Sequence, residues 1–313
     1  MATQVLRAAK TKPAADPERG HRWRMLLAVV GSAGVLLAIA FYGARYYTAP
    51  LSERIGDPLH ALLRPSGAIG IRLGQIGLGC MALLYLYGIR KHWPWLRAIG
   101  NTRHWLDFHI LLGITGPLLV TFHSSFKLQG LAGVAFWVMW TVVMSGFVGR
   151  YFYGQIPRSM TAAELSMKEM EAAREALAAK LESQRLLSAA DLAPLFRLPG
   201  PEQVQRMSLG AALGTMIWLD AQRPFQVSRL RRKALPARMI LLSLGGLLPF
   251  APKDLEMVIA TVRKQAWLSM KISFLSKAQA VFHLWHVIHR PFSYSLAALA
   301  LIHVATVLLF GYF

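Results

Sequence analysis

Five apolar segments, each long enough to cross a lipid bilayer, limit the folds open to this chain of 313 residues. A helix of about 20 apolar residues spans the hydrocarbon core, where only helices and closed barrels satisfy every backbone polar group. The predicted spans are 25–47, 68–89, 105–126, 132–153 and 281–312. The pattern predicts an all-α integral membrane bundle of about five transmembrane helices, with a helical cytoplasmic insert before the last helix.

These spans divide the chain into four segments. Residues 1–24 form a cytoplasmic N-terminal segment, 25–155 hold the first four spans, 156–280 form the cytoplasmic or interfacial insert, and 281–313 hold the fifth span. Within the insert, 160–190 reads as an amphipathic helix. Two further apolar stretches, 207–219 and 239–248, are too short and too rich in glycine for spans. They are predicted to lie flat on the membrane surface or to pack against the membrane domain.

The net charge of +20, from 35 Lys and Arg against 15 Asp and Glu, is distributed unevenly. Of these basic residues, 29 fall in segments 1–25, 90–103 and 150–280. By the positive-inside rule these segments are cytoplasmic, so the N-terminus is predicted inside and the C-terminus outside a bacterial-type inner membrane. No interleaving of aromatic and basic residues suggests nucleic acid as a partner. The surplus charge is predicted to attract anionic lipid or an acidic protein.

Cysteine content excludes several redox sites. Cys80 is the single cysteine, and it lies within the second predicted span. One thiol cannot ligate an iron–sulfur cluster, close an intrachain disulfide or form a CxxCH haem attachment. Cys80 is therefore interpreted as a small packing residue.

Two histidine pairs with equal spacing point to a function. His109 and His123 are 14 positions apart in the third span, and His289 and His303 are 14 positions apart in the fifth. In a helix this spacing covers roughly 21 Å and returns to within about 40° of the same face. The two helices are predicted to run parallel, so His109 pairs with His289 near the inner leaflet and His123 with His303 near the outer. Each pair could supply both axial ligands of a haem b iron.

The neighbours of these histidines suit a porphyrin. Gly113 and Gly116 lie on the face of His109, where small side chains leave room for a flat ring. Arg290 or Arg103 could bind the propionates of the inner haem, and the outer haem has three candidate partners, Lys127, Ser124 and Arg72. His104, His283 and His286 lie about 100° or more from the shared stripe. The competing interpretation is that the four histidines serve helix packing or a proton relay.

The sequences HILLGITGPLLVTFH (109–123) and HRPFSYSLAALALIH (289–303) resemble the ferric reductase-like transmembrane family. That family includes ferric reductases, NADPH oxidases and the haem subunit of methionine sulfoxide reductase systems. The motif HxxHRP at 286–291 also resembles bacterial cytochrome b subunits that accompany flavin, iron–sulfur or multihaem partners. The resemblance covers about 80 residues and implies stacked haems b held by His109, His123, His289 and His303.

No GxGxxG precedes a helix and the chain ends at Phe313 after the fifth span, so a nicotinamide or flavin site is not expected.

Three hypotheses follow for function. The first is an electron-transfer subunit of an oxidoreductase complex, working with a flavin or iron–sulfur protein, cytochrome c or quinone. The second is a quinone-reactive membrane anchor that uses Asp57 and His60 near the outer haem, or His104, Asp107 and His286 near the inner one. The third is a histidine-lined proton or metal transporter, although its spans lack a series of carboxylates.

Overall fold

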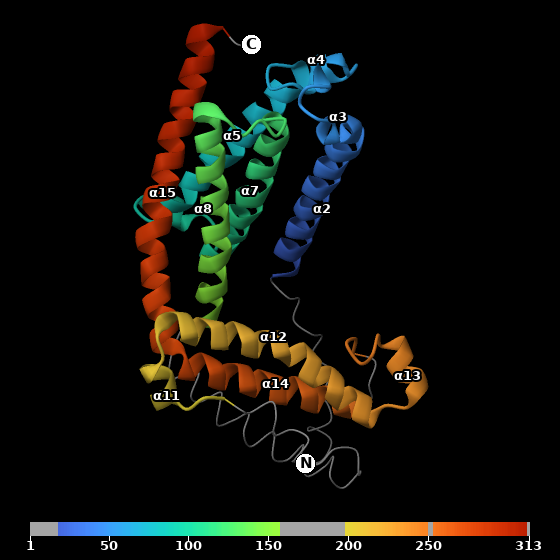
Figure 1. Ribbon diagram of the computed structural model, residues 1–313. Coiled ribbons are helices and arrows are strands. Elements are labelled where there is room, and N and C mark those ends of the chain that lie inside the picture. Colours follow the sequence, from blue (N-terminus) through green and yellow to red (C-terminus); the bar gives the residue numbers. More distant parts are fainter. Residues whose placement is uncertain (1–17, 157–197, 250–252, 312–313) are drawn as a thin grey trace, which may run out of the picture. The chain divides into compact units, whose positions relative to one another are not determined.

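The computed structural model describes residues 18–156, 198–249 and 253–311, which are helical and contain no strand. Five of the described helices are long and apolar enough to cross a membrane. They are α2 (Arg19–Tyr42), α5 (Ala68–Ile89), α7 (Thr102–His123), α8 (Gly130–Gln155) and α15 (Leu275–Phe310), seen in Figure 1. The prediction of an all-α membrane bundle is confirmed, and the protein is a multi-pass membrane protein.

The described residues form two compact units. The first comprises Met1–Met144 and Arg290–Phe313, and the second comprises Ser145–His289. Because α8 and α15 cross the boundary, each contributes turns to both units. The first unit also contains four short elements, α3 (Ala44–Thr48), η1 (Arg54–Gly56), α4 (His60–Leu63) and α6 (Pro94–Ala98). The second contains α11 (Pro201–Arg206), α12 (Leu209–Ala234), α13 (Ala237–Leu242) and α14 (Lys253–Ser273).

Helices α5 and α7 make the most extensive helix–helix contact of the first unit. A Cβ atom added at Gly77 would lie 2.7 Å from Val120 Cγ2 and 3.1 Å from the Gly116 carbonyl oxygen. A Cβ atom added at Gly116 would lie 3.0 Å from Cys80 Cβ. Small residues that let two backbones approach are typical of helix contacts within membranes, where the hydrophobic effect does not drive association. Cys80 therefore lies at this contact, as a small packing residue.

The second unit is held by an apolar core between its helices. The core joins the last turns of α8 and the first turns of α15 to α11, α12 and α14, through Phe152, Val204, Ala212, Met216, Met270, Phe274, Ala278 and Val281. Asp220 of α12 also accepts hydrogen bonds from the Tyr151 hydroxyl (2.7 Å) and the Gln155 amide (3.1 Å) of α8. The end of the fourth span is thereby fastened to α12.

The bounds predicted within the insert differ from the structure. All but the first two residues of the stretch 207–219 belong to the longer helix α12, which continues past Pro224 because polar residues beyond it find partners on α14. The stretch 239–248 contains the end of α13 and then a turn in which Leu244, Gly245 and Gly246 have positive φ. The predicted helix 160–190 lies outside the described residues.

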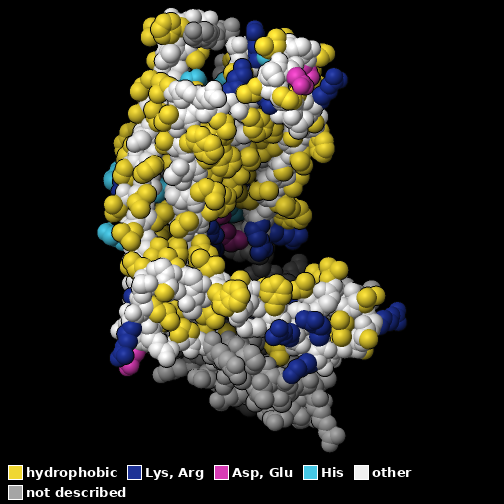
Figure 2. Space-filling view, viewed as in Figure 1, with side chains coloured by type: hydrophobic (Ala, Val, Ile, Leu, Met, Phe, Trp, Pro, Cys, Tyr) yellow, Lys and Arg dark blue, Asp and Glu magenta, His cyan; other side chains and the backbone are white. Residues whose placement is uncertain are grey.

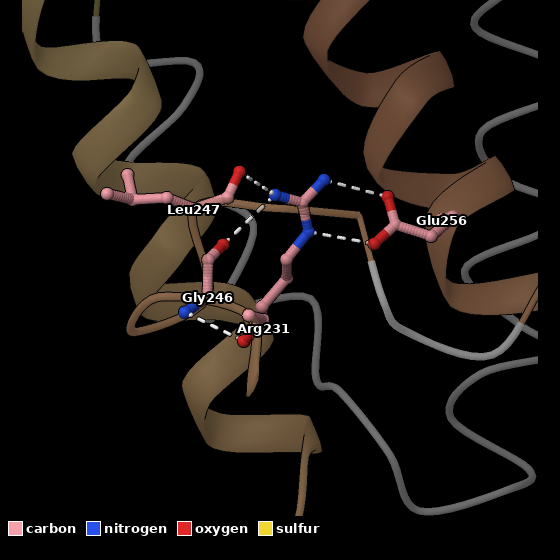
Figure 3. A network of polar contacts seen from close by, with 5 residues as sticks. Arg231, Gly246, Leu247 and Glu256 are labelled. Atoms are coloured by element: carbon pink, nitrogen blue, oxygen red, sulfur yellow. Dashed lines mark hydrogen bonds and ion pairs between the residues drawn. The ribbon is translucent and has the colours of Figure 1, made fainter. Parts of the chain in front are cut away.

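A buried arginine fastens that turn to its neighbours (Figure 3). Arg231 of α12 donates two hydrogen bonds of 2.8 Å to the carboxylate of Glu256 on α14. It also donates to the carbonyl oxygens of Gly246 and Leu247, both at 3.0 Å. A paired guanidinium that also binds backbone oxygens fixes geometry as well as charge. The turn after α13 is thus held between α12 and α14.

Gly77→Val is expected to lower the free energy of unfolding by about 1–3 kcal/mol, because the new side chain overlaps Val120 and the Gly116 backbone. The matched control is Gly79→Val on the same helix, where an added Cβ meets nothing within 4 Å. Thermal unfolding of both variants in detergent micelles measures the difference. Equal melting temperatures would contradict the importance of the α5–α7 contact.

Candidate functional site

Two of the predicted haem ligands lie together in the first unit. The rings of His123 on α7 and His303 on α15 have centres 6.5 Å apart and planes inclined by 69°. Two imidazoles that bind one metal ion from opposite sides, at about 2.0–2.1 Å each, have ring centres about 6 Å apart. The spacing of this pair therefore suits one iron atom between the two rings.

Helix α5 supplies a backbone partner for each histidine of α7. Nδ1 of His123 lies 2.8 Å from the Gly70 carbonyl oxygen, and Nδ1 of His109 lies 3.3 Å from that of Leu84. A carbonyl oxygen can only accept, so Nδ1 must be the protonated nitrogen that donates. In the neutral ring Nε2 then carries the free lone pair, which is the form that binds a metal. Gly70 and Leu84 are themselves 14 positions apart, matching the spacing of the histidines.

A glycine on α5 makes room for the imidazole of His123. A Cβ atom added at Gly74 would lie 2.8 Å from His123 Nδ1, so the ring could not keep its place beside a larger residue. The same helix also reaches α15, because the Tyr85 hydroxyl donates to the Ser293 carbonyl oxygen at 2.5 Å. Helix α5 therefore orients His123 and contacts the helix that carries His303.

Neighbouring side chains in the second unit hold the ring of His289 in place. Its Nδ1 lies 2.6 Å from the Ser145 hydroxyl, and its ring stacks on Trp285 with centres 4.8 Å apart. The indole nitrogen of Trp285 donates to the Ser145 carbonyl oxygen, and Gly149 gives the indole its space. His109 and His289 belong to different units, and their pairing stays a prediction.

The small and cationic residues predicted around the haems have varied surroundings. Gly116 is buried where α7 meets α5, while a Cβ atom at Gly113 would have only Leu84 near it, at 3.9 Å. Arg103 and Arg290 are exposed, as are Lys127 and Arg72. The Ser124 hydroxyl donates to the Thr121 carbonyl oxygen. Contact with α5 explains Gly116 without a porphyrin, and the cofactor roles of all these residues stay predictions.

Metal centres differ in the number of ligands that they take from protein side chains. Within the described parts of the chain, no group of three or more His, Cys, Asp or Glu side chains is placed to hold a metal. A protein-bound zinc ion takes three or four such ligands. A haem iron needs only two axial ligands from the protein, because the porphyrin supplies the others. The pair His123 and His303 supplies two imidazoles, which is the number of axial ligands that a haem iron takes.

A second cluster joins the first turns of α2 and α7. His21 Nε2 lies 3.0 Å from Asp107 Oδ2, and His104 Nε2 lies 3.0 Å from Glu18 Oε2. The two imidazoles stack with centres 3.5 Å apart. The hydrogen bond with His104 lowers the pKa of the Glu18 carboxyl. The two residues that each helix contributes are three positions apart in the sequence, but nothing there indicates that α2 and α7 meet at these residues.

These contacts also explain where the first helix begins. Helix α2 starts at Arg19, six residues before the predicted span, because Glu18 and His21 bind the side chains of α7. His21 is buried even though the segment around it is basic and polar. Sequence reasoning selected His104 and Asp107 of this cluster and missed their two partners.

The other residues named for quinone chemistry lie apart from this cluster along the chain. Asp57 accepts a hydrogen bond from the Leu59 amide, and His60 Nδ1 lies 3.2 Å from the Tyr46 hydroxyl. His286 Nδ1 lies 3.2 Å from the Phe282 carbonyl oxygen in its own helix. The contacts of Asp57 and His286 are local, whereas the contact of His60 joins α4 to α3.

Arg54 supports the end of α7, directly after His123. This buried guanidinium donates to the carbonyl oxygens of Ser125 (2.5 Å), Tyr47 (2.8 Å) and Ala49 (2.9 Å). Ser125 and Phe126 have positive φ, which is strained for residues other than glycine. The Ser125 hydroxyl also donates to the Leu63 carbonyl oxygen. Arg54 thereby stabilises the sharp turn that follows His123.

Comparison with known proteins found no matching protein-family model, no matching curated protein and no matching solved structure.

Arg54→Met is expected to lower the free energy of unfolding by about 2–3 kcal/mol, because it leaves three carbonyl oxygens without their charged donor. Thermal unfolding of the purified protein measures the loss. The control is Arg45→Met, which removes an exposed guanidinium 3.9 Å from Asp57 and should cost less than about 1 kcal/mol. Similar losses in the two variants would show that the Arg54 contacts do not stabilise the turn.

Proposed function

We propose that the chain is a membrane cytochrome b subunit that carries electrons across the bilayer through two haems b, each held by two histidines. The observation that carries the proposal is the pair His123 and His303, whose ring centres lie 6.5 Å apart. The hydrogen bond from His123 Nδ1 to Gly70 leaves Nε2 free for iron, which supports the same role.

The chain's own residues would hold and tune the cofactor. His123 and His303 would be the axial ligands of the outer haem, and His109 and His289 those of the inner one. The carbonyl oxygens of Gly70 and Leu84 would orient the two rings of α7 and raise their basicity as ligands. A bound haem b supplies a ferric–ferrous couple that accepts and returns one electron. The apolar spans would keep water from both sites.

Electrons would enter and leave through other proteins or through quinone. The sequence carries no dinucleotide-binding motif, so a flavin or iron–sulfur protein, cytochrome c or quinone is the proposed partner class. The resemblance of segments 109–123 and 289–303 to ferric reductase-like proteins supports this reading. The positive-inside distribution supports a bacterial-type inner membrane, with His109 and His289 toward the cytoplasm.

The test is a dithionite-reduced minus oxidised spectrum of the purified chain, with haem counted as the pyridine haemochrome. Two low-spin haems b per chain are expected. Because each haem needs both of its ligands, the double variant His123→Ala with His303→Ala should keep one haem. The double variant His109→Ala with His303→Ala should keep none, since it damages both sites.

Two further variants serve as controls. His283→Ala removes an exposed histidine that lies off the ligand stripe, and it should keep both haems. Gly74→Val removes no ligand but crowds His123, so it should lose the outer haem, whereas Gly79→Val should keep both. A chain without a Soret band, after expression with haem supplied, would overturn the proposal and favour the histidine-lined transporter.

Quinone chemistry is a second candidate function, favoured by the cluster of Glu18, His21, His104 and Asp107. Carboxylates that orient imidazoles are typical of sites that exchange protons with a bound ligand. His104→Gln is expected to reduce quinol-dependent haem reduction at least about tenfold while both haems stay bound. The matched control is His283→Ala. Unchanged reduction kinetics in His104→Gln would remove the cluster as a quinone site.

A further inference from the structure

The exposed face of α12 has the wrong composition for contact with water. Over 211–225 this face carries no charge and consists of Ala211, Gly214, Ile217, Trp218, Ala221, Pro224 and Phe225. Trp218 and Phe225 have 63% and 64% of their surfaces exposed. A helix on the surface of a soluble protein places polar and charged residues on this side. The described residues therefore leave an apolar face of α12 uncovered.

The turn after α13 continues this apolar surface. Leu241 and Leu244 are 82% and 67% exposed, and Leu247 and Leu248 are also exposed. The bonds from Arg231 to Gly246 and Leu247 hold the turn in place, so the leucines are displayed on a fixed backbone (Figure 3). In Figure 2 hydrophobic side chains gather along α12, and Lys and Arg side chains lie toward its end near α13.

The charge of this region complements an anionic surface. Between residues 206 and 249 the chain has seven Lys and Arg but a single acid, Asp220. Asp220 is already bonded to Arg223, Tyr151 and Gln155. Arg229, Arg232, Lys233 and Arg238 are exposed. Basic residues beside exposed aromatic and leucine side chains are typical of helices that lie in the headgroup layer of a membrane.

The position of α12 along the chain agrees with that partner. Asp220 and Met216 of α12 bind Tyr151, Gln155 and Phe152 in the last turns of α8, which is itself a membrane span. A helix fastened to the end of a span is within reach of the lipid headgroups.

We propose that the exposed face of α12 and the turn after α13 form a lipid-binding surface, which inserts Trp218, Phe225 and Leu244 into the headgroup layer of an anionic leaflet. Its basic side chains would bind lipid phosphates while its apolar side chains reach the acyl boundary. This surface is independent of the haem ligands, so it does not depend on the proposed function.

The test uses the full chain in lipid nanodiscs. In a Cys80→Ala background, Phe225→Cys and Leu244→Cys are each labelled with bimane, and Lys264→Cys, an exposed position on α14, is the control. Brominated phosphatidylglycerol should quench the two test positions at least about twofold relative to unbrominated lipid, and the control little. The ratio between the two lipids cancels any quenching by bound haem.

Two further measurements use iodide as a quencher in the aqueous phase and nanodiscs of neutral lipid as a comparison. The Lys264 label should be quenched by iodide, and the two test labels should be protected from it. Quenching of the Phe225 and Leu244 labels by iodide but not by brominated lipid would overturn the proposal, leaving a protein partner as the occupant of the surface. Equal bromolipid quenching in phosphatidylcholine and phosphatidylglycerol nanodiscs would overturn the preference for an anionic leaflet.

Discussion

The close contact between α5 and α7 is the constraint on which the arrangement of His123 and His303 depends. Gly77 and Gly116 let the two backbones approach until side chains of one helix reach carbonyl oxygens of the other. At that distance the imidazole of His123 fits over Gly74 and donates to Gly70. A wider contact would leave both histidines of α7 without these acceptors, and their rings could then turn freely. The orientation of the two histidine rings therefore depends on the glycines at the contact between α5 and α7.

Much of the membrane fold could be predicted because hydropathy is a local property. The span predicted at 68–89 coincides with α5, and the other four spans were found with shifted ends. The start of α2 shifted because Glu18 and His21 contact side chains of α7, which extends the helix into polar sequence. In the insert, α12 continues past Pro224 because its second half packs on α14 through Arg223 and Arg231. Such contacts join residues far apart in the chain, so no local pattern announces them.

The candidate site was predictable in part for a similar reason. The sequence itself gives the 14-residue spacing of His109 and His123, and helix geometry then places both residues on a common face. Their acceptors could not be found this way, since a backbone carbonyl oxygen has no signature in the sequence. The register between α5 and α7 decides which carbonyl oxygen meets which ring. That register follows from where the glycines allow contact, which became visible only with both helices in place.

The matched spacing on α5 and α7 restricts how these helices can vary in length. One residue inserted between Gly70 and Leu84 would turn one of the two carbonyl oxygens by about 100° and move it by about 1.5 Å. Neither helix could compensate for that change alone, because His109 must still meet the Leu84 carbonyl oxygen while His123 meets that of Gly70. Related chains should therefore tolerate many substitutions along these helices but few insertions or deletions, which would be confined to the helix ends and the connecting loop.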